Sequence, residues 1–408
     1  MRPELSRRGG IGAVLVVLLA LVPAAGSSAH AGGRARIALS ASFAPPGTLV
    51  HAQGRGFPGT SRGRLLLGRR PIGTFHTGSL GGFDTRFTVA DRRPGTVRLT
   101  AVAGNVVATR RFGIMGTTAS DPPVLFGAST SPGPSDFTEL DAFEAAAGKH
   151  VRLFNFYQGW PYSGFNATEM SAIAARGAIP MVTWEPWDYT KGVRQPLYTL
   201  NRIANGAYDT YIRNWATAAK AWGGRIFLRF AHEMNGNWYP WCEGVNGNKP
   251  GSYVKAWRHV HGIFTSVGAT NVQWIWSPNV VFSGSTPFSE LYPGDAYVDW
   301  VALDGYNGGT ALNWGGWLSF GQIFDASLAQ LRSLAPTKPI MIAEVASAEA
   351  GGSKAAWITD FFAALAADPD IKAFDWFNWN RETDWRIQSS PAAAAAFAAG
   401  VADPRYGS

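Results

Sequence analysis

Two glutamates follow short apolar runs, among residue types that suit sugar chemistry. Glu233 lies in the aromatic-rich stretch Arg229-Phe-Ala-His-Glu-Met-Asn-Gly-Asn-Trp-Tyr-Pro-Trp241. Glu344 follows the run Pro339 to Ala343, which indicates a buried strand. Glycosidic bonds are cut by two carboxyl groups, one protonated to serve the leaving group and one ionised to take the sugar carbon. The sequence therefore predicts that Glu233 and Glu344 form such a pair. A carboxylate that caps the following helix is the alternative, but that role favours Ser, Thr, Asn or Asp over Glu.

Eight strand-like runs alternate with amphipathic stretches from Val124 to the C-terminus. The runs cover residues 124–128, 151–157, 179–184, 226–231, 272–276, 300–303, 339–343 and 373–379. Eight such units over about 280 residues are what a (β/α)₈ TIM barrel requires. A doubly wound open sheet is the alternative, but it would favour a Gly-rich first turn, and the turn after Phe126 has no GxGxxG. We therefore predict an α/β barrel over residues 124–408.

The carboxyl ends of the barrel strands would form one surface, where the active sites of such barrels collect. Tryptophan is 17 of 408 residues, and many tryptophans fall at these ends. Flat aromatic faces stack on sugar rings, while amides and carboxylates bond sugar hydroxyls. Besides the two glutamates, the predicted substrate contacts are Trp184, Glu185, His232, Asn235, Trp238, Tyr306 and Trp376. For Glu185 we favour a structural or sugar-hydroxyl role over direct catalysis, and Trp379 competes with Trp376.

Neither a cofactor nor a metal site is indicated. His259 and His261 are two positions apart on a helical stretch and so face different ways. The single cysteine, Cys242, excludes an internal disulfide, and no partnering His for a nucleophilic thiol is apparent, so we expect a packed thiol.

The first 123 residues differ in character from the rest. Residues 1–31 hold three arginines, an apolar run and a final Ala-His-Ala, which is typical of a secretory signal cleaved after Ala31. Residues 32–115 alternate short apolar runs with Gly and Pro turns, which predicts an all-β sandwich. It loosely resembles the immunoglobulin-like modules of secreted bacterial enzymes. The small, polar segment 116–123 is the predicted linker, and we expect a secreted, extracellular protein.

The basic charge is confined to this N-terminal part. Residues 32–115 contain thirteen Arg and two Asp, a net charge of +11, whereas the whole chain carries +8. Such arginines usually form a solvated face, and the less favoured alternative is a weak contact with acidic cell-wall polymers. Nucleic acid is a poor candidate partner, because the chain is expected to be exported and shows no recognised motif.

From about Val124 onward the chain resembles glycoside hydrolase family 26, a retaining (β/α)₈ family best known for endo-β-1,4-mannanases. The run His-Glu-Met-Asn-Gly-x-Trp carries the resemblance. It implies that Glu233 is the acid/base, Glu344 the nucleophile and His232 the histidine beside the acid. It also matches Tyr306 to a tyrosine near the nucleophile. Trp238 matches the aromatic residue after the acid, and Trp376 matches a sugar platform on the last strand.

The resemblance implies double displacement, with the two carboxyl carbons roughly 5–5.5 Å apart. We expect a monomer that acts on a polysaccharide, with β-1,4-mannan as the favoured substrate. Pro240 stands where we expect a further aromatic residue in mannanases, which leaves a lichenase-like β-1,3-1,4-glucanase as the alternative. The family also includes β-1,3-xylanases. A non-catalytic carbohydrate-binding protein is less favoured, because it would not need both carboxylates.

Overall fold

The computed structural model describes residues 35–39, 43–44, 49–89, 95–114 and 124–407. The predicted signal segment 1–31 and linker 116–123 lie outside the described residues, so both remain predictions, as do the domain boundaries drawn from them. Within the described ranges, every helix is too short or too polar to cross a membrane.

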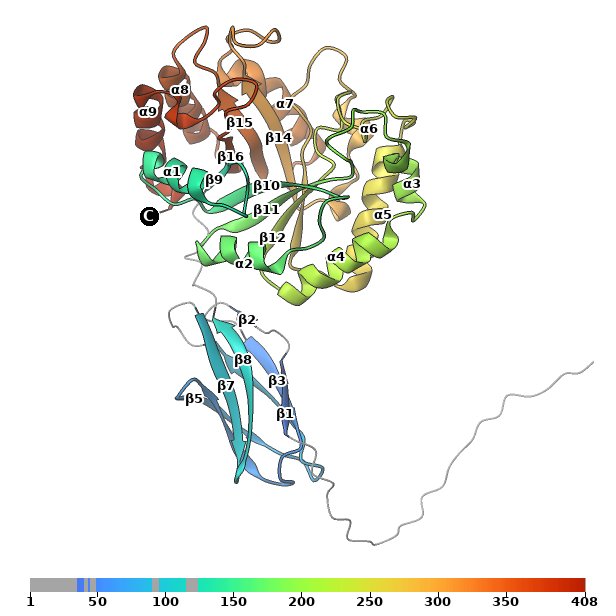
Figure 1. Ribbon diagram of the computed structural model, residues 1–408, viewed down its shortest axis with the longest axis vertical. Helices are drawn as coiled ribbons and strands as arrows, with labels where there is room; N and C mark the ends of the chain where they lie inside the picture. The colour runs from blue at the N-terminus through green and yellow to red at the C-terminus, as the bar shows by residue number, and fades with distance from the viewer. Residues whose placement is uncertain (1–34, 40–42, 45–48, 90–94, 115–123, 408) are drawn as a thin grey trace, which may run out of the picture.

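Eight parallel strands close into a barrel, in which each strand pairs with the next and the last returns to the first (Figure 1). The strands are β9 (Leu125–Ser129), β10 (Leu153–Gly159), β11 (Ile179–Glu185), β12 (Ile226–Phe230), β13 (Val272–Trp276), β14 (Trp300–Asn307), β15 (Ile340–Ser347) and β16 (Ile371–Phe377). The predicted (β/α)₈ fold is confirmed, and each predicted run overlaps one strand.

Helices cover the outside of the barrel (Figure 1). They are α1 (Thr138–Ala147), α2 (Ala167–Ala175), α3 (Leu200–Ala204), α4 (Asp209–Trp222), α5 (Ser252–Val267), α6 (Phe288–Leu291), α7 (Phe320–Leu334), α8 (Lys354–Ala367) and α9 (Pro391–Val401). In α4, the buried residues Ile212, Trp215, Ala219 and Trp222 recur at helical spacing, so one apolar stripe faces the strands. Packing of such stripes on the strands fixes where each strand ends.

The barrel interior is apolar at one level and polar at the next. Side chains of a strand alternate between its two faces, so every second residue points into the barrel. The apolar interior cluster comprises Leu125, Leu153, Ile179, Met181, Phe227, Ile275, Trp300, Ala302, Met341, Ala343 and Ala373. Two positions further along β10, β11 and β12 come Asn155, Thr183 and Arg229, which are buried and polar. The polar level therefore lies toward the carboxyl ends of the strands.

The N-terminal part forms two β-sheets around a separate core. One sheet has the order β1-β3-β6 and the other β2-β8-β7-β4-β5. The strands are β1 (Arg36–Leu39), β2 (Phe43–Ala44), β3 (Leu49–Arg55), β4 (Arg62–Leu67), β5 (Arg70–His76), β6 (Phe83–Thr88), β7 (Gly95–Ala103) and β8 (Val106–Ile114). Their apolar side chains, among them Phe75, Phe83 and Phe112, form a cluster that shares no residue with the barrel core. The predicted all-β module before the barrel is confirmed.

Candidate active site

Glu233 sits on a tight loop directly after β12. Ala231 and Glu233 have φ angles of 47° and 51°, a left-handed conformation that residues other than glycine rarely adopt. The loop is held by Trp241 Nε1, which donates to the His232 carbonyl at 2.6 Å, and by Glu233 N, which donates to the Ser277 carbonyl at 2.7 Å. Backbone strain of this kind persists only where the surroundings enforce it, as they do at many functional sites.

A β-bulge turns Glu344 into the mouth of the barrel. Met341 and Ala343 already point inward on β15, so strict alternation would turn residue 344 outward. The register between β14 and β15 shifts here, because Leu303 pairs with Ile342 while the next residue, Asp304, pairs with Glu344. Bulges re-aim side chains in this way next to active sites.

Three donors converge on the Glu344 carboxylate. Tyr157 donates its hydroxyl to Oε1 at 2.7 Å, Arg229 donates Nη2 to the same oxygen, and Tyr306 donates its hydroxyl to Oε2. All three are N–H or O–H groups, and bonds of this kind are strongest when the acceptor oxygen is charged. The arrangement suits an ionised carboxylate with a fixed orientation.

Arg229 also holds other polar side chains of the barrel interior in place. Its Nη1 donates to Asp304 Oδ2 at 2.7 Å, and its Nε donates to the Thr183 hydroxyl at 2.9 Å. Thr183 in turn donates to Asn155 at 2.8 Å. The guanidinium is fully buried, and its two carboxylate partners supply the charge that such a burial requires.

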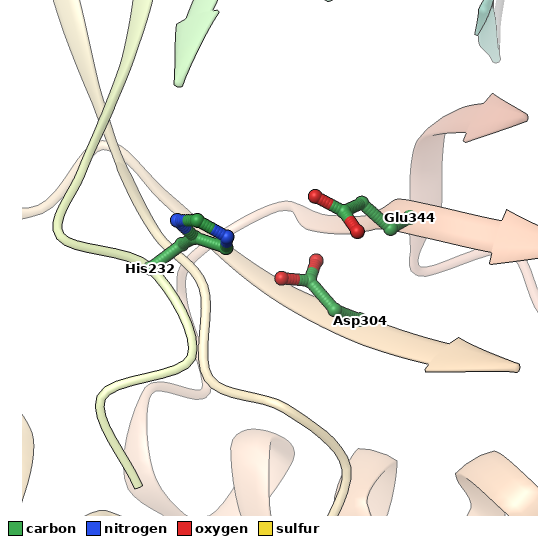
Figure 2. A group of neighbouring side chains, drawn as sticks. All are labelled: His232, Asp304 and Glu344. Carbon is green, nitrogen blue, oxygen red and sulfur yellow. The ribbon is translucent and has the colours of Figure 1, made fainter. Parts of the chain in front are cut away.

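His232, Asp304 and Glu344 converge from a loop, from β14 and from β15 (Figure 2). They offer possible metal-ligand atoms within 4.8 Å of one another. Arg229 already donates to both carboxylates, and a divalent cation there would meet its positive charge. The geometry thus favours an ion-pair network around Arg229 over a metal centre.

Glu233, Glu185 and His232 in this mouth have shifted pKa values. Burial, aided by the negative charge of Glu344, raises the pKa of Glu233 to about 8. Burial also raises the pKa of Glu185 to about 7, and this carboxyl lies close enough to Arg229 and Glu344 to feel both charges. His232 is buried beside the positive charge of Arg229, and both causes place its pKa well below the usual value. Glu233 is therefore protonated and His232 neutral near pH 7.

Trp238 forms an open wall beside Glu233. Its side chain is 37% exposed, and its Nε1 donates to Glu233 Oε2 at 2.7 Å. The ring folds over Gly236, where a Cβ atom would meet the indole at 2.6 Å. Glycine is thus needed for this close approach. Trp238 also contacts Phe282, with ring centroids 5.5 Å apart.

Residues 177–369 match the family model "Glycosyl hydrolase family 26". These residues form a glycosyl hydrolase family 26 domain. The matched range includes Glu185, Glu233, Tyr306 and Glu344, whereas Tyr157 and strand β16 lie outside it.

Two relatives and two solved structures illustrate the family 26 likeness. Endoglucanase H of Acetivibrio thermocellus is 40% identical over 286 residues, which cover 66% of this chain but only 29% of that protein. The mannan endo-1,4-beta-mannosidase A and B of Caldalkalibacillus mannanilyticus is 39% identical over 90 residues, or 21% of this chain and 17% of that protein. This chain therefore matches less than a third of either relative.

The solved structures show the same fold. A Cellulomonas fimi endo-beta-1,4-mannanase double mutant aligns with a TM-score of 0.54 and 22% identity, over 69% of this chain and 71% of that one. The catalytic domain of the Bacillus sp. JAMB-750 GH26 endo-beta-1,4-mannanase aligns with a TM-score of 0.54 and 20% identity, over 69% and 86%.

Three predicted substrate contacts do not face the mouth of the barrel. Trp184 is fully buried and packs outward against Trp215 of α4, with ring centroids 5.2 Å apart. Trp376 is also fully buried, packs against Phe397 of α9 at 5.2 Å, and donates Nε1 to a backbone carbonyl. Neither ring offers a face to a sugar, so both predictions were wrong.

Asn235 is the third. Asn235 Nδ2 donates to the Asn279 carbonyl at 2.8 Å, and Asn235 Oδ1 accepts from the backbone N–H of Asn279 at 2.9 Å. Because the side chain is buried and ties the loop after β12 to the loop after β13, it supports the site without facing substrate.

The structure brings together His232, Glu233, Glu344, Tyr306 and Glu185 as expected, but their predicted roles stay predictions. It adds Tyr157, which was not predicted because it lies within a strand run and not after one. Tyr157 lies within β10, two positions beyond the inward-facing Asn155, so alternation along the strand could have found it.

On the segment after β16, Trp379 approaches the site in place of Trp376. Its ring meets the Tyr157 ring edge-on at 6.1 Å and stacks on Phe377 at 5.6 Å.

Cys242 is buried, and burial raises the pKa of its thiol to about 12, which agrees with a packed thiol.

Proposed function

We propose that the chain is a secreted, retaining endo-β-glycoside hydrolase that works by double displacement. The supporting observation is the contrast between two neighbouring carboxyl groups. Glu233 keeps its proton at neutral pH, while Glu344 receives three hydrogen bonds that suit a carboxylate. A protonated acid beside an oriented carboxylate is the pair that glycosidic cleavage needs.

In the first step Glu344 attacks the anomeric carbon, and the bond from that carbon to the leaving oxygen breaks. Glu233 gives its proton to the leaving oxygen, so the released sugar departs as an alcohol and Glu233 becomes ionised. In the second step Glu233 takes a proton from water, whose oxygen attacks the anomeric carbon and displaces Glu344. The enzyme returns to its starting protonation state.

Tyr157, Tyr306 and Arg229 would act by orienting Glu344. Their bonds compete for the same lone pairs that attack the sugar, so they must weaken as the glycosyl bond forms. His232 stays neutral and packs against Tyr239, with ring centroids 4.8 Å apart, which fits a wall of the sugar site and not a proton donor. Glu185 would accept a hydrogen bond from a sugar hydroxyl.

For the substrate we propose a β-glucan first and β-1,4-mannan second. The sequence favours mannan, but a relative that aligns over 66% of this chain is named an endoglucanase. The relatives named mannosidases align over much shorter stretches, such as 90 residues. The likeness to solved mannanases concerns the fold alone.

A panel of polysaccharides tests this proposal. Reducing-sugar release would be measured on barley glucan, glucomannan, galactomannan and β-1,3-xylan, with the Glu344→Ala variant as the control for each. We expect turnover on barley glucan to exceed that on galactomannan. Preference for galactomannan would restore the mannanase assignment, and no release from any of the four would contradict the proposed activity.

We also propose that the N-terminal module contacts acidic wall polymers after export. Arg98 on β7 and Arg111 on β8 are directly paired across the sheet, and both are exposed, as is Arg64 on β4. Like charges directly opposite each other destabilise a sheet, which an anionic ligand would relieve. Export rests on the sequence of residues 1–31, and the monomeric state is likewise proposed.

A further inference from the structure

The exposed large apolar side chains of the barrel share one location. Among residues 124–407, they all lie on segments that follow the carboxyl ends of the strands: Tyr162, Tyr189, Leu197, Trp238, Phe282 and Trp314. These segments surround the end of the barrel that carries Glu233 and Glu344. Single exposed apolar residues are normal on any protein, but their confinement to one end marks a binding surface.

Tyr162 and Tyr189 form a pair on this surface. Tyr162 follows the end of β10 by three residues, and Tyr189 follows the end of β11 by four. Their side chains are 47% and 59% exposed, and the ring centroids lie 4.5 Å apart at an interplanar angle of 35°. Two neighbouring loops thus present one aromatic patch to solvent.

The pair is held in place by Asp188. Tyr162 donates its hydroxyl to Asp188, which also accepts from the backbone N of Thr190 at 3.0 Å and pairs with Lys191 at 3.0 Å. The ring of Tyr162 is therefore oriented before any ligand arrives. Pre-orientation of this kind reduces the entropy lost on binding.

The patch is continuous with the catalytic mouth. Trp160 and Trp187 both donate their backbone N–H to the Glu185 carbonyl at 2.9 Å, which ties the two loops to the end of β11. Trp187 packs on Tyr239 at 5.2 Å, and Tyr239 packs on His232. Tyr189 lies four positions after Glu185, so their Cα atoms are at most about 14 Å apart.

We propose that Tyr162 and Tyr189 form a distal sugar platform for the same β-glucan chain that Glu233 and Glu344 cleave. Exposed phenol rings offer flat apolar faces to a sugar ring, and Asp188 with Lys191 offers charged groups at their edge for hydroxyls. The platform rests on the proposed function and extends it. It holds a sugar beyond those at the cleavage point, which favours long chains and internal cleavage.

Activity on long and short substrates tests the platform. Residues Tyr162 and Tyr189 would be replaced together by alanine, and kcat/KM would be measured on barley glucan and on a short cello-oligosaccharide. We expect the ratio of the two values to fall by about two- to twelvefold, as loss of about 0.5–1.5 kcal/mol of stacking implies. An unchanged ratio would overturn the proposal.

Two matched variants separate stacking from other effects. Leu197→Ala removes an exposed apolar side chain from the same β11 segment but no ring, so the ratio should stay as in the unaltered chain. Tyr189→Phe keeps the ring and should also keep the ratio. A fall in either variant as large as that of the double alanine variant would contradict a stacking platform.

Binding without turnover separates this proposal from the proposed function. In the Glu344→Ala background, affinity electrophoresis in barley glucan should show retardation that the double alanine variant reduces. If the unaltered chain cleaves no glycan but this retardation depends on the tyrosine pair, the platform stands and the hydrolase proposal fails. If cleavage occurs and the double alanine substitution leaves the retardation unchanged, only the platform proposal fails.

Discussion

Glu233 and Glu344 are the same residue type in one barrel mouth, but their surroundings differ. Glu233 is buried, feels the negative charge of Glu344 and accepts one hydrogen bond, from Trp238. Glu344 accepts three hydrogen bonds, one of them from a buried guanidinium. Environments that separate two carboxyl groups in this way assign the acid and the base of a reaction.

Replacing Glu233 by Ala should affect substrates according to their leaving groups. Natural glycans need protonation of the leaving oxygen, and general acid catalysis contributes about 10²–10⁴-fold, so kcat/KM should fall by that order. Aryl glycosides with acidic phenols need little protonation and should lose much less in the first step. Steady-state rates on both substrate types provide the check, and equal losses would argue against an acid role.

The pKa of Glu233 predicts an alkaline limit of activity. The acid must carry its proton, and its raised pKa means that the proton is lost only as the pH rises through about 8. For a glycan substrate, kcat/KM should therefore decline above this pH by about tenfold per pH unit. If the Glu233→Ala variant shows an alkaline decline of kcat/KM with the same midpoint, the decline belongs to another group. Glu185, with a pKa of about 7, would be the first candidate.

At the residue scale, the sequence identified the two glutamates because each follows an apolar run. The resemblance also pointed to Tyr306, but no local pattern shows that Tyr157, Arg229 and Tyr306 converge on Glu344, since they come from three different strands. Only the closed barrel brings them together. The shifted pKa values likewise depend on burial that no local pattern encodes.

At the element scale, strand alternation decides which side chains face the site. Trp184 and Glu185 are neighbours on β11, and Trp376 follows Asp375 on β16. In each pair the carboxyl faces the interior and the tryptophan packs under the helices. Position near a strand end alone predicts both tryptophans as sugar contacts, but alternation turns their rings to the outer face of the barrel. Glu344 breaks the alternation through a bulge, which apolar patterning cannot anticipate.

Two tryptophan variants test this reassignment. Trp376→Ala should cost about 3–5 kcal/mol of unfolding free energy, because it empties a fully buried site between β16 and α9. Its KM for glucan should stay within a few-fold. Trp379→Ala should raise the KM for glucan and should lower the free energy of unfolding by less than Trp376→Ala does. Thermal denaturation and initial rates give both quantities, and a KM effect confined to Trp376→Ala would restore the original platform assignment.

At the scale of the whole molecule, the chain contains two structural parts with separate cores. The site residues described above all belong to the barrel, whereas the excess positive charge lies in residues 32–115. Apolar runs that alternate with Gly and Pro turns predicted the N-terminal module, and apolar runs that alternate with amphipathic stretches predicted the barrel. Both patterns can be detected in the sequence because they reflect the local geometry of strands and helices. The sequence does not specify a ligand for the module, since dispersed arginines also suit a solvated face.

Deleting residues 32–121 should leave turnover of soluble oligosaccharides unchanged within a few-fold, because the barrel has its own core. The deletion should weaken sedimentation with cell walls at low ionic strength. At 1 M salt the Debye length is about 3 Å, so the difference should vanish there. Equal sedimentation of both forms at low salt would refute the wall contact, and a folded but inactive barrel would mean that the module contributes to the site.

The most direct test of the central claim is to trap the covalent intermediate on the nucleophile. A 2-deoxy-2-fluoro β-glycoside of cellobiose with a good leaving group slows both steps but lets the first proceed, so the glycosyl-enzyme accumulates. Mass spectrometry of the intact chain and its peptides should show one added glycosyl group, located on Glu344 and absent from Glu344→Ala. Attachment to Glu185 or Glu233, or inverted product with no attachment, would contradict the account.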